Sequence, residues 1–179
     1  MIMYKLEIVL INFSIYLQFV QQCEHFHSAL ALFVQRPTEF SQELADSTLF
    51  ISQVAHCYSS SANQCSGHVS RFIAALMDAL RTRSGTVQMH ANTRRVLCQA
   101  LMHLRRKRLV PANEALALIF DVLTLSCPDK ALRRQLASFL VFDIRLVNKR
   151  HKNNKLNSVI LILQMSWCLT SYCFNFLIH

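Results

Sequence analysis

The sequence contains very little glycine and proline, with two glycines and three prolines among its 179 residues. β-Hairpins and tight strand-to-helix connections use these residues in quantity, because their turns need positive or fixed φ angles. Loops that cradle phosphate also need glycine, and neither GxGxxG nor GxxxxGK[ST] is present. The scarcity therefore argues against β-rich folds and nucleotide-binding loops, and it favours helices joined by short polar links.

Catalytic motifs are missing as well. No HExxH or GxSxG occurs, and the ten carboxylates are scattered, without a close pair on one helical face that could act as general acid and base. We therefore predict that the chain is not an enzyme and takes no cofactor and no small-molecule substrate. A subunit that relies on an active site in another chain is a less favoured alternative.

Cysteine and histidine are present, but not at metal-binding spacing. Seven cysteines occur, an odd number that does not form the tight framework of a secreted disulfide protein, so we expect reduced thiols in an intracellular protein. Cys23 with His27, and Cys57 and Cys65 with His68, lack paired CxxC or HxxxH spacing, so no metal site is predicted. His56 and Cys57 are expected to be core or boundary residues.

Apolar residues recur at helical spacing along most of the chain and predict six helices. The first ends near Gln35, before Pro37, and Ser41 caps the second. A serine-rich loop, Ser59 to Ser66, precedes the third. The residues predicted to face inward in these three helices are Phe19, Cys23, Phe26, Leu30, Phe33, Leu44, Ile51, Ala55, Tyr58, Val69, Ile73, Leu76 and Leu80.

The ends of the remaining helices are predicted from local signals. Ser84 and Gly85 stop the third helix, Asn92 caps the fourth, Pro111 lies in the first turn of the fifth, and Asp129 caps the sixth. This pattern predicts an all-α fold of about six to seven helices. Periodicity alone leaves open a bundle and a HEAT/armadillo-like α-solenoid. Inward positions here are Leu97, Leu101, Leu104, Leu116, Ile119, Phe120, Leu123, Leu132, Leu136, Phe139 and Val147.

Positive charge is concentrated in the middle of the chain. The net charge is +9, yet residues 1–70 hold two cations and five anions, residues 71–155 hold seventeen cations and five anions, and residues 156–179 hold none. A field of this kind suits phosphate backbones, acidic proteins or an anionic membrane surface.

Two basic clusters stand at the ends of predicted helices. The first is Arg105-Arg106-Lys107-Arg108, and the second is Lys149-Arg150-His151-Lys152 with Lys155. In a stacked array these ends could share one edge, so we predict an anion-binding strip for RNA phosphate or acidic proteins, with nuclear import as an alternative role. Aromatic residues do not interleave with the cations, so base-specific RNA recognition is not predicted.

The stretch from Leu156 to Ile178 is uncharged, about long enough to cross a bilayer, and preceded by cations. It raises the alternative of a tail-anchored membrane adaptor with a basic helical domain. Polar residues dilute the stretch and Trp167 lies near its middle, not at an interface, so we expect no membrane partner.

The string His151-Lys152-Asn153-Asn154-Lys155-Leu156-Asn157, after Phe142-Asp143-Ile144, resembles a signature of the severe-depolymerisation-of-actin (SDA) family. Four other stretches resemble the same family in the same order: Phe19–His25, Gln42–Tyr58, Arg94–Leu104 and Asp129–Asn148. The resemblance implies an α-solenoid of the nucleus and nucleolus. Such proteins associate with precursors of the large (60S) ribosomal subunit and are needed for the maturation and export of these precursors. The resemblance also implies an effect on actin organisation.

The resemblance also divides the chain. It covers residues 18–160, which are expected to form the helical-repeat domain, and family members are several times longer, so this chain resembles their amino-terminal part. Residues 1–17 do not resemble the family's lead-in, and residues 161–179 form an apolar tail. We interpret residues 1–17 as a product of the gene model. Residues 161–179 are interpreted either as a product of the gene model or as a continuation of the helices.

Overall fold

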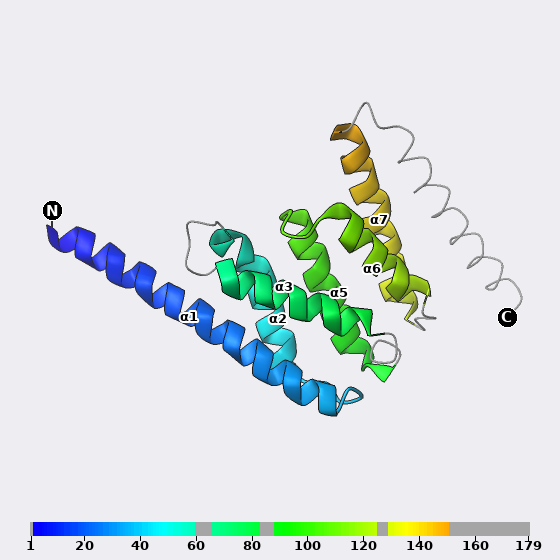
Figure 1. Cartoon of the computed structure of the whole chain (residues 1–179), viewed down its shortest axis with the longest axis horizontal. Coiled ribbons are helices and arrows are strands. Elements are labelled where there is room, and N and C mark those ends of the chain that lie inside the picture. The colour runs from blue at the N-terminus through cyan, green and yellow to red at the C-terminus, as the bar shows by residue number, and fades with distance from the viewer. Residues whose placement is uncertain (1, 60–65, 83–87, 125–128, 151–179) are drawn as a thin grey trace, which may run out of the picture. The chain divides into compact units, whose positions relative to one another are not determined.

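The computed structural model describes residues 2–59, 66–82, 88–124 and 129–150, and in these residues the chain forms six helices and no strand (Figure 1). The helices are α1 (Ile2–Gln35), α2 (Gln42–Tyr58), α3 (Ser66–Arg81), α5 (Ala91–Arg106), α6 (Ala112–Thr124) and α7 (Lys130–Arg150). The predicted all-α class is confirmed. The chain divides into two compact units, Met1–Ser126 and Cys127–His179.

Two of the predicted caps are confirmed. Ser41 Oγ accepts a hydrogen bond from the N–H of Leu44 at 3.2 Å. Asp129 Oδ1 accepts from Ala131 and Leu132 at 3.0 and 3.1 Å. In both cases a short polar side chain satisfies N–H groups that lack partners within the first helical turn.

Two predicted helix starts are wrong by one residue or more. The helix assigned to an Asn92 cap begins at Ala91, and its cap is His90, whose Nδ1 accepts from Asn92 N–H at 3.3 Å. Pro111 lies just before α6, not in its first turn, and its carbonyl accepts from Ala115 N–H at 3.1 Å. The predicted stop at Ser84 and Gly85 lies outside the described residues.

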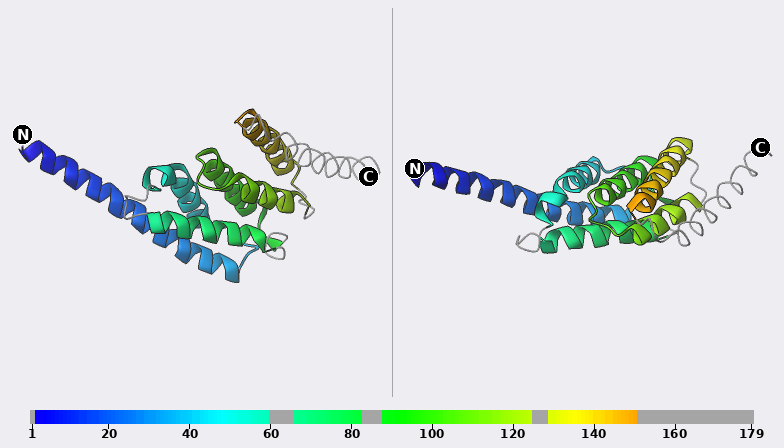
Figure 2. Two further views of the ribbon diagram at one scale, coloured as in Figure 1. Left: turned by 45° about the horizontal axis from the view of Figure 1, so that its top comes forward. Right: turned by 90° about the horizontal axis from the view of Figure 1, so that it is seen from above.

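The helices of the first unit lie in two layers. α1 contacts α3 and α3 contacts α6, while α2 packs most extensively on α5, and Figure 2 shows α2 and α5 on the opposite side from α3 and α6. Successive helices thus alternate between the layers. Alternation of this kind is typical of stacked helix pairs, so the solenoid alternative is confirmed over the bundle.

Contacts at both ends show that α2 and α5 are parallel. At their starts, the N–H of His90 donates to Pro37 O at 2.9 Å, and the rings of Phe40 and His90 lie 5.6 Å apart. Nearer their ends, Ser52 Oγ lies 3.4 Å from His103 Nδ1. Corresponding helices of successive pairs therefore end on the same edge of the unit.

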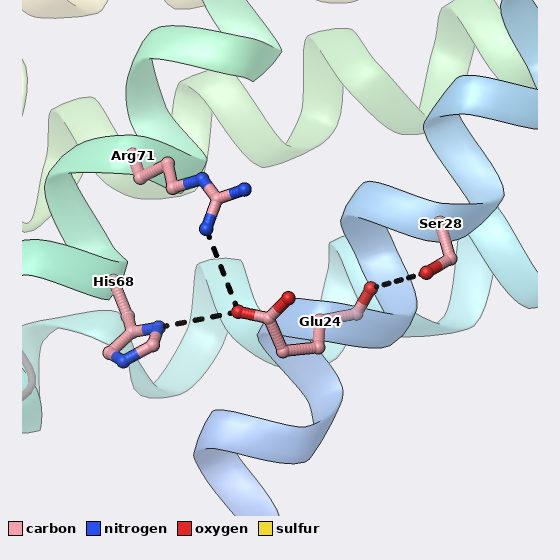
Figure 3. A network of polar contacts seen from close by, with 4 residues as sticks. All are labelled: Glu24, Ser28, His68 and Arg71. Atoms are coloured by element: carbon pink, nitrogen blue, oxygen red, sulfur yellow. Dashed lines mark hydrogen bonds and ion pairs between the residues drawn. The ribbon is translucent and has the colours of Figure 1, made fainter.

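The α1–α3 contact has an aromatic centre and a polar margin. The rings of Phe26 and Phe72 meet edge to face at 4.6 Å, and both side chains are fully buried. Beside them, Glu24 Oε1 lies 3.8 Å from His68 Nδ1 and 3.7 Å from Arg71 Nη1 (Figure 3). These polar partners are partly exposed, so the aromatic pair supplies most of the stabilisation.

The buried face of α2 carries small polar side chains, and one of them, Ser52, contacts α5. Ser47, Thr48 and Ser52 of α2 are buried, although all three are polar. Their hydroxyls donate back to carbonyls of their own helix, from Ser47 to Glu43 O at 2.8 Å and from Ser52 to Leu49 O at 2.9 Å. The hydroxyls of Ser47 and Thr48 are thus satisfied within α2, and that of Ser52 also lies within hydrogen-bond distance of His103 Nδ1 on α5.

Most of the predicted core is confirmed. Fully buried side chains include the predicted Phe19, Leu44, Ile51, Leu76, Leu80, Leu97, Leu101 and Leu104. Leu30, Tyr58, Ile73, Phe120 and Leu123 are half-buried. In the second unit, the predicted Leu132, Leu136 and Phe139 of α7 are buried, while the side chain of Val147 lies outside the described residues.

The expectation for His56 and Cys57 is wrong, because both are exposed on α2. Both follow the buried Ala55 and lie on the face that turns to solvent. Among the described residues no group of three or more histidine, cysteine or acidic side chains could hold a metal ion; Cys65 lies outside them.

In the described part of the chain, no helix has the length and apolar character needed to cross a membrane. The stretch from Leu156 to Ile178, on which the tail-anchor alternative depends, lies outside that part.

Candidate anion-binding site

The first basic cluster lies at the C-terminal end of α5, a helix that contains no acidic residue. His103, Arg105 and Arg106 occupy its last turn, and Lys107 and Arg108 follow. Cations at this end are stabilised by the negative pole of the helix dipole. The helix end therefore supports a higher density of positive charge than an irregular loop would.

The backbone after α5 forms a closed turn. The N–H groups of Lys107, Arg108 and Leu109 donate to the carbonyls of His103, Arg105 and Leu104 at 3.0, 2.9 and 3.0 Å. The bond from Leu109 to Leu104 and the bond from Arg108 to Arg105 together define a Schellman motif. Leu104 is fully buried and Leu109 half-buried, so the turn is held on its apolar side as well.

Arg108 occupies the left-handed position of this turn, with a φ of 62°. Glycine is the usual residue there, because a Cβ in this conformation crowds the backbone at a cost of about 1–2 kcal/mol. No other non-glycine residue in the described part of the chain has a positive φ. Arginine at this position therefore costs stability relative to glycine.

The four cations of the cluster do not have equal roles. Arg105 is half-buried, and its Nη1 donates to Val110 O at 3.4 Å, which ties the helix end to the segment leading into α6. Arg106, Lys107 and Arg108 are exposed. The structure therefore gives Arg105 a part in holding the turn and leaves three consecutive cations on the surface.

The pKa of His103 is affected by the positive charge around it. Burial lowers the pKa of His103 below its ordinary value of 6.5, and the charges of Arg106 and Lys107 lower it further. Arg94, earlier on α5, contributes nothing to this surface, because it is buried and its Nη2 donates to Met89 O at 2.9 Å. Apart from the exposed Arg95 in its first half, the accessible charge of α5 is thus gathered at its end.

The second cluster is described only at its start. Lys149 and Arg150 belong to the last turn of α7, in the second unit, and their side chains lie outside the described residues. So do His151, Lys152, Asn153, Asn154 and Lys155. A strip shared by the two clusters stays a prediction.

Hollows run along α3 on the other layer. One of about 680 Å³ is lined by α1, α3 and α6, and a smaller one of about 260 Å³ lies between α3 and α6. Their charged margins mix Arg71 and Arg81 with Asp78 and Glu114. Because both signs of charge are present, these hollows favour no particular charged ligand.

His27 lies beside the larger hollow, and its Nε2 is buried without a hydrogen-bond partner among the described residues. Burial lowers the pKa of His27, and the charges of Arg71 and His68 lower it further, while Glu24 opposes them. The ring is therefore biased toward its neutral form by the fold.

Comparison with known proteins agrees with this architecture. The family model described as "SDA1, HEAT repeat" matches residues 50–166. The protein named "Protein SDA1 homolog" of Nematostella vectensis is 37% identical over 143 residues, which cover 80% of this chain. Its namesakes in Xenopus tropicalis and Drosophila melanogaster are 35% and 37% identical over 143 and 141 residues, or 80% and 79% of this chain.

The aligned segment is a small part of those relatives. It spans 19% of the Nematostella and Xenopus tropicalis proteins and 18% of the Drosophila protein. The likeness thus concerns about a fifth of their length.

Proposed function

The chain belongs to the SDA1 family, and from that premise we propose that it is a non-catalytic scaffold in the assembly of the 60S ribosomal subunit and the export of its precursor to the cytoplasm. Its place of action is then the nucleus and nucleolus. The HEAT-repeat fold supports a scaffold, because stacked helix pairs present extended surfaces to large partners.

One observation carries this proposal beyond the family. The exposed cations Arg106, Lys107 and Arg108 stand together on a fixed turn at the end of α5. A ribosomal precursor is rich in phosphate, and a cationic patch held by a folded helix end suits such a partner. We propose that this patch, with the predicted cluster Lys149 to Lys155, is the contact with the particle.

The test is co-sedimentation with pre-60S particles. The test variant replaces seven cations with glutamine: Arg105, Arg106, Lys107, Arg108, Lys149, Arg150 and Lys152. The matched control replaces seven cations elsewhere: Arg36, Arg71, Arg81, Arg95, Lys130, Arg134 and Arg145. We expect association and nucleolar localisation to be lost in the test variant and largely kept in the control. Unchanged association of the test variant would contradict the proposed contact.

An effect on actin organisation, which the family resemblance implies, forms part of the same proposal. Depletion of the chain followed by staining of actin filaments tests it, and the seven-cation variant is then expressed to attempt rescue. If that variant restores the organisation of actin filaments but not the assembly of the 60S subunit, the two roles are separate.

A further inference from the structure

Three properties of the turn after α5 bear on what it binds. The first is conformation. An import signal that is read as an extended peptide needs its backbone free, but here Arg105 and Arg106 are helical, and the N–H groups of Lys107 and Arg108 are bonded to helix carbonyls. The cations are thus displayed as a folded surface, not as a linear peptide.

The second property is the αL strain at Arg108, whose φ is 62°. Glycine at this position would relieve the strain and keep the turn. A strained backbone at an exposed position points to a role of the side chain that the turn itself does not require. The guanidinium of Arg108 has no hydrogen bond or ion pair within the described part of the chain, so its role is directed outward.

The third property is the absence of apolar anchors. From Gln88 to Pro111 no large hydrophobic side chain is exposed. Protein interfaces depend on buried aromatic or aliphatic anchors at their centre, whereas phosphate backbones are bound through charge and hydrogen bonds without such anchors. Stacking on single-stranded bases would likewise require an exposed ring in this segment.

We propose that Arg106, Lys107 and Arg108 form a fold-dependent site for the phosphate backbone of double-helical RNA. The inference rests on the proposed function, because it names the partner of the same basic cluster. Arginine suits this role, since its planar guanidinium can donate two hydrogen bonds to one phosphate. Arg105, through its bond to Val110 O, is the positioning residue of the site.

The experiment measures binding of the whole chain to a short labelled RNA duplex by fluorescence anisotropy over a salt series. The triple variant Arg106→Gln, Lys107→Gln, Arg108→Gly is compared with a charge-matched control, Arg36→Gln, Arg95→Gln, Arg134→Gln. Each phosphate contact adds about 0.9 to the slope of log affinity against log salt. We expect the triple variant to lose about two to three units of slope, and the control less than one.

The single variant Arg108→Gly is the control for correct folding, because glycine fits the turn. We expect it to lose about one unit of the salt slope, while its urea midpoint stays unchanged or rises. Equal losses in the triple variant and its control would overturn the proposal, because net charge would then suffice. So would equal affinity for oligouridylate of the same length, or equally effective competition by polyglutamate, which would indicate a single strand or an acidic protein.

Failure of this inference is distinct from failure of the proposed function. If the seven-cation variant leaves the pre-60S particles while the triple variant binds the duplex as the unaltered chain does, the RNA assignment falls and the scaffold stands. If duplex binding is lost but association with particles is unchanged for both variants, the site binds RNA without serving the particle, and the proposed contact falls. The proposed function itself falls if the unaltered chain does not co-sediment with pre-60S particles.

Discussion

At Arg108 an exposed cationic side chain is combined with a strained backbone conformation. Its αL conformation is the one place in the described chain where a non-glycine residue has positive φ. Lys107, one residue earlier, has an ordinary φ of −81° in the same turn. The two neighbours, both exposed and both cationic, therefore form a natural pair for separating charge from strain.

We predict that Arg108→Gly raises the free energy of unfolding by about 0.5–1 kcal/mol, since relief of the αL strain exceeds the added entropy of the unfolded chain. Urea unfolding followed by circular dichroism measures it. Lys107→Gly is the control and should lower stability by a few tenths of a kcal/mol up to about 1 kcal/mol, since it adds freedom without relieving strain. If both variants shift the midpoint alike, the strain is not specific to Arg108.

Two histidines give stability a pH dependence. The pKa values of His27 and His103 are lowered in the folded chain, so between the folded and unfolded pKa values the unfolded state binds more protons. Stability from these residues is therefore complete above pH 6.5 and declines as pH falls through the folded values. We predict that the double variant His27→Gln, His103→Gln shows a smaller loss of stability below about pH 6.5 than the unaltered chain.

The exposed His25, on the same helix as His27, supplies the control. The double variant is compared with His25→Gln, which removes an exposed imidazole from the same helix. A double variant that follows the unaltered chain at every pH would show that neither ring loses stability on protonation.

At the scale of helices, the close approach of α2 and α5 depends on side-chain volume. Ser52, which contacts His103 of α5, is fully buried, and Ala100 is fully buried on α5. A larger side chain at such a position must displace its neighbours, because protein interiors are already close-packed. The helix pair therefore tolerates hydrophobic substitution poorly at its centre, even though the surroundings are apolar.

We predict that Ser52→Leu lowers the free energy of unfolding by about 1–3 kcal/mol through overpacking. The neighbouring exposed Gln53 provides the comparison, and Gln53→Leu should change stability by less than about 0.5 kcal/mol. Thermal or urea unfolding of the two variants decides it; a stable Ser52→Leu variant would mean that the interface is loose at this point.

Helices α2 and α5 also show which buried positions can be predicted from the sequence and which cannot. The leucine positions 97, 101 and 104 are predictable, because helical spacing alone places them on one face and burial follows from their apolarity. Thr48, Ser52 and Arg94 are not, since their burial depends on hydrogen bonds to nearby carbonyls that no apolar pattern records. The pattern misplaces His56 because small differences in helix rotation decide on which side of Ala55 the solvent lies.

The candidate site is predictable in part for similar reasons. Four consecutive cations near the last inward leucine of a helix are visible in the sequence. The division between the half-buried Arg105 and the three exposed cations is not, because it depends on tertiary contacts such as the bond from Arg105 to Val110 O. The αL conformation of Arg108 also escapes prediction, since arginine carries no signal for a position that glycine normally fills.

For the whole molecule, an uneven charge of +9 has an energetic consequence. Like charges repel in the compact state, and salt screens that repulsion. The ion pairs Arg36–Glu39 and Glu24–Arg71 are solvent-exposed and weak, so screening them costs little. Added sodium chloride should therefore favour the folded chain.

We predict that the thermal midpoint rises by a few degrees as salt increases through the physiological range, which corresponds to a gain of at most about 1 kcal/mol. The triple variant at Arg106, Lys107 and Arg108 should respond less, because it has lost three clustered cations. Differential scanning calorimetry on both chains gives the comparison. A midpoint that falls with salt would mean that attraction, not repulsion, dominates the charge pattern.

The two layers of the first unit also differ in how they resist bending. α2 contacts α5 through buried residues that include the small Ser52, whereas hollows of about 680 and 260 Å³ lie along α3 in the opposite layer. A lateral load would therefore close the hollows first, with the α2–α5 contact as the hinge line. We therefore expect the array to bend toward the α3 side at a lower force than toward the α2–α5 side.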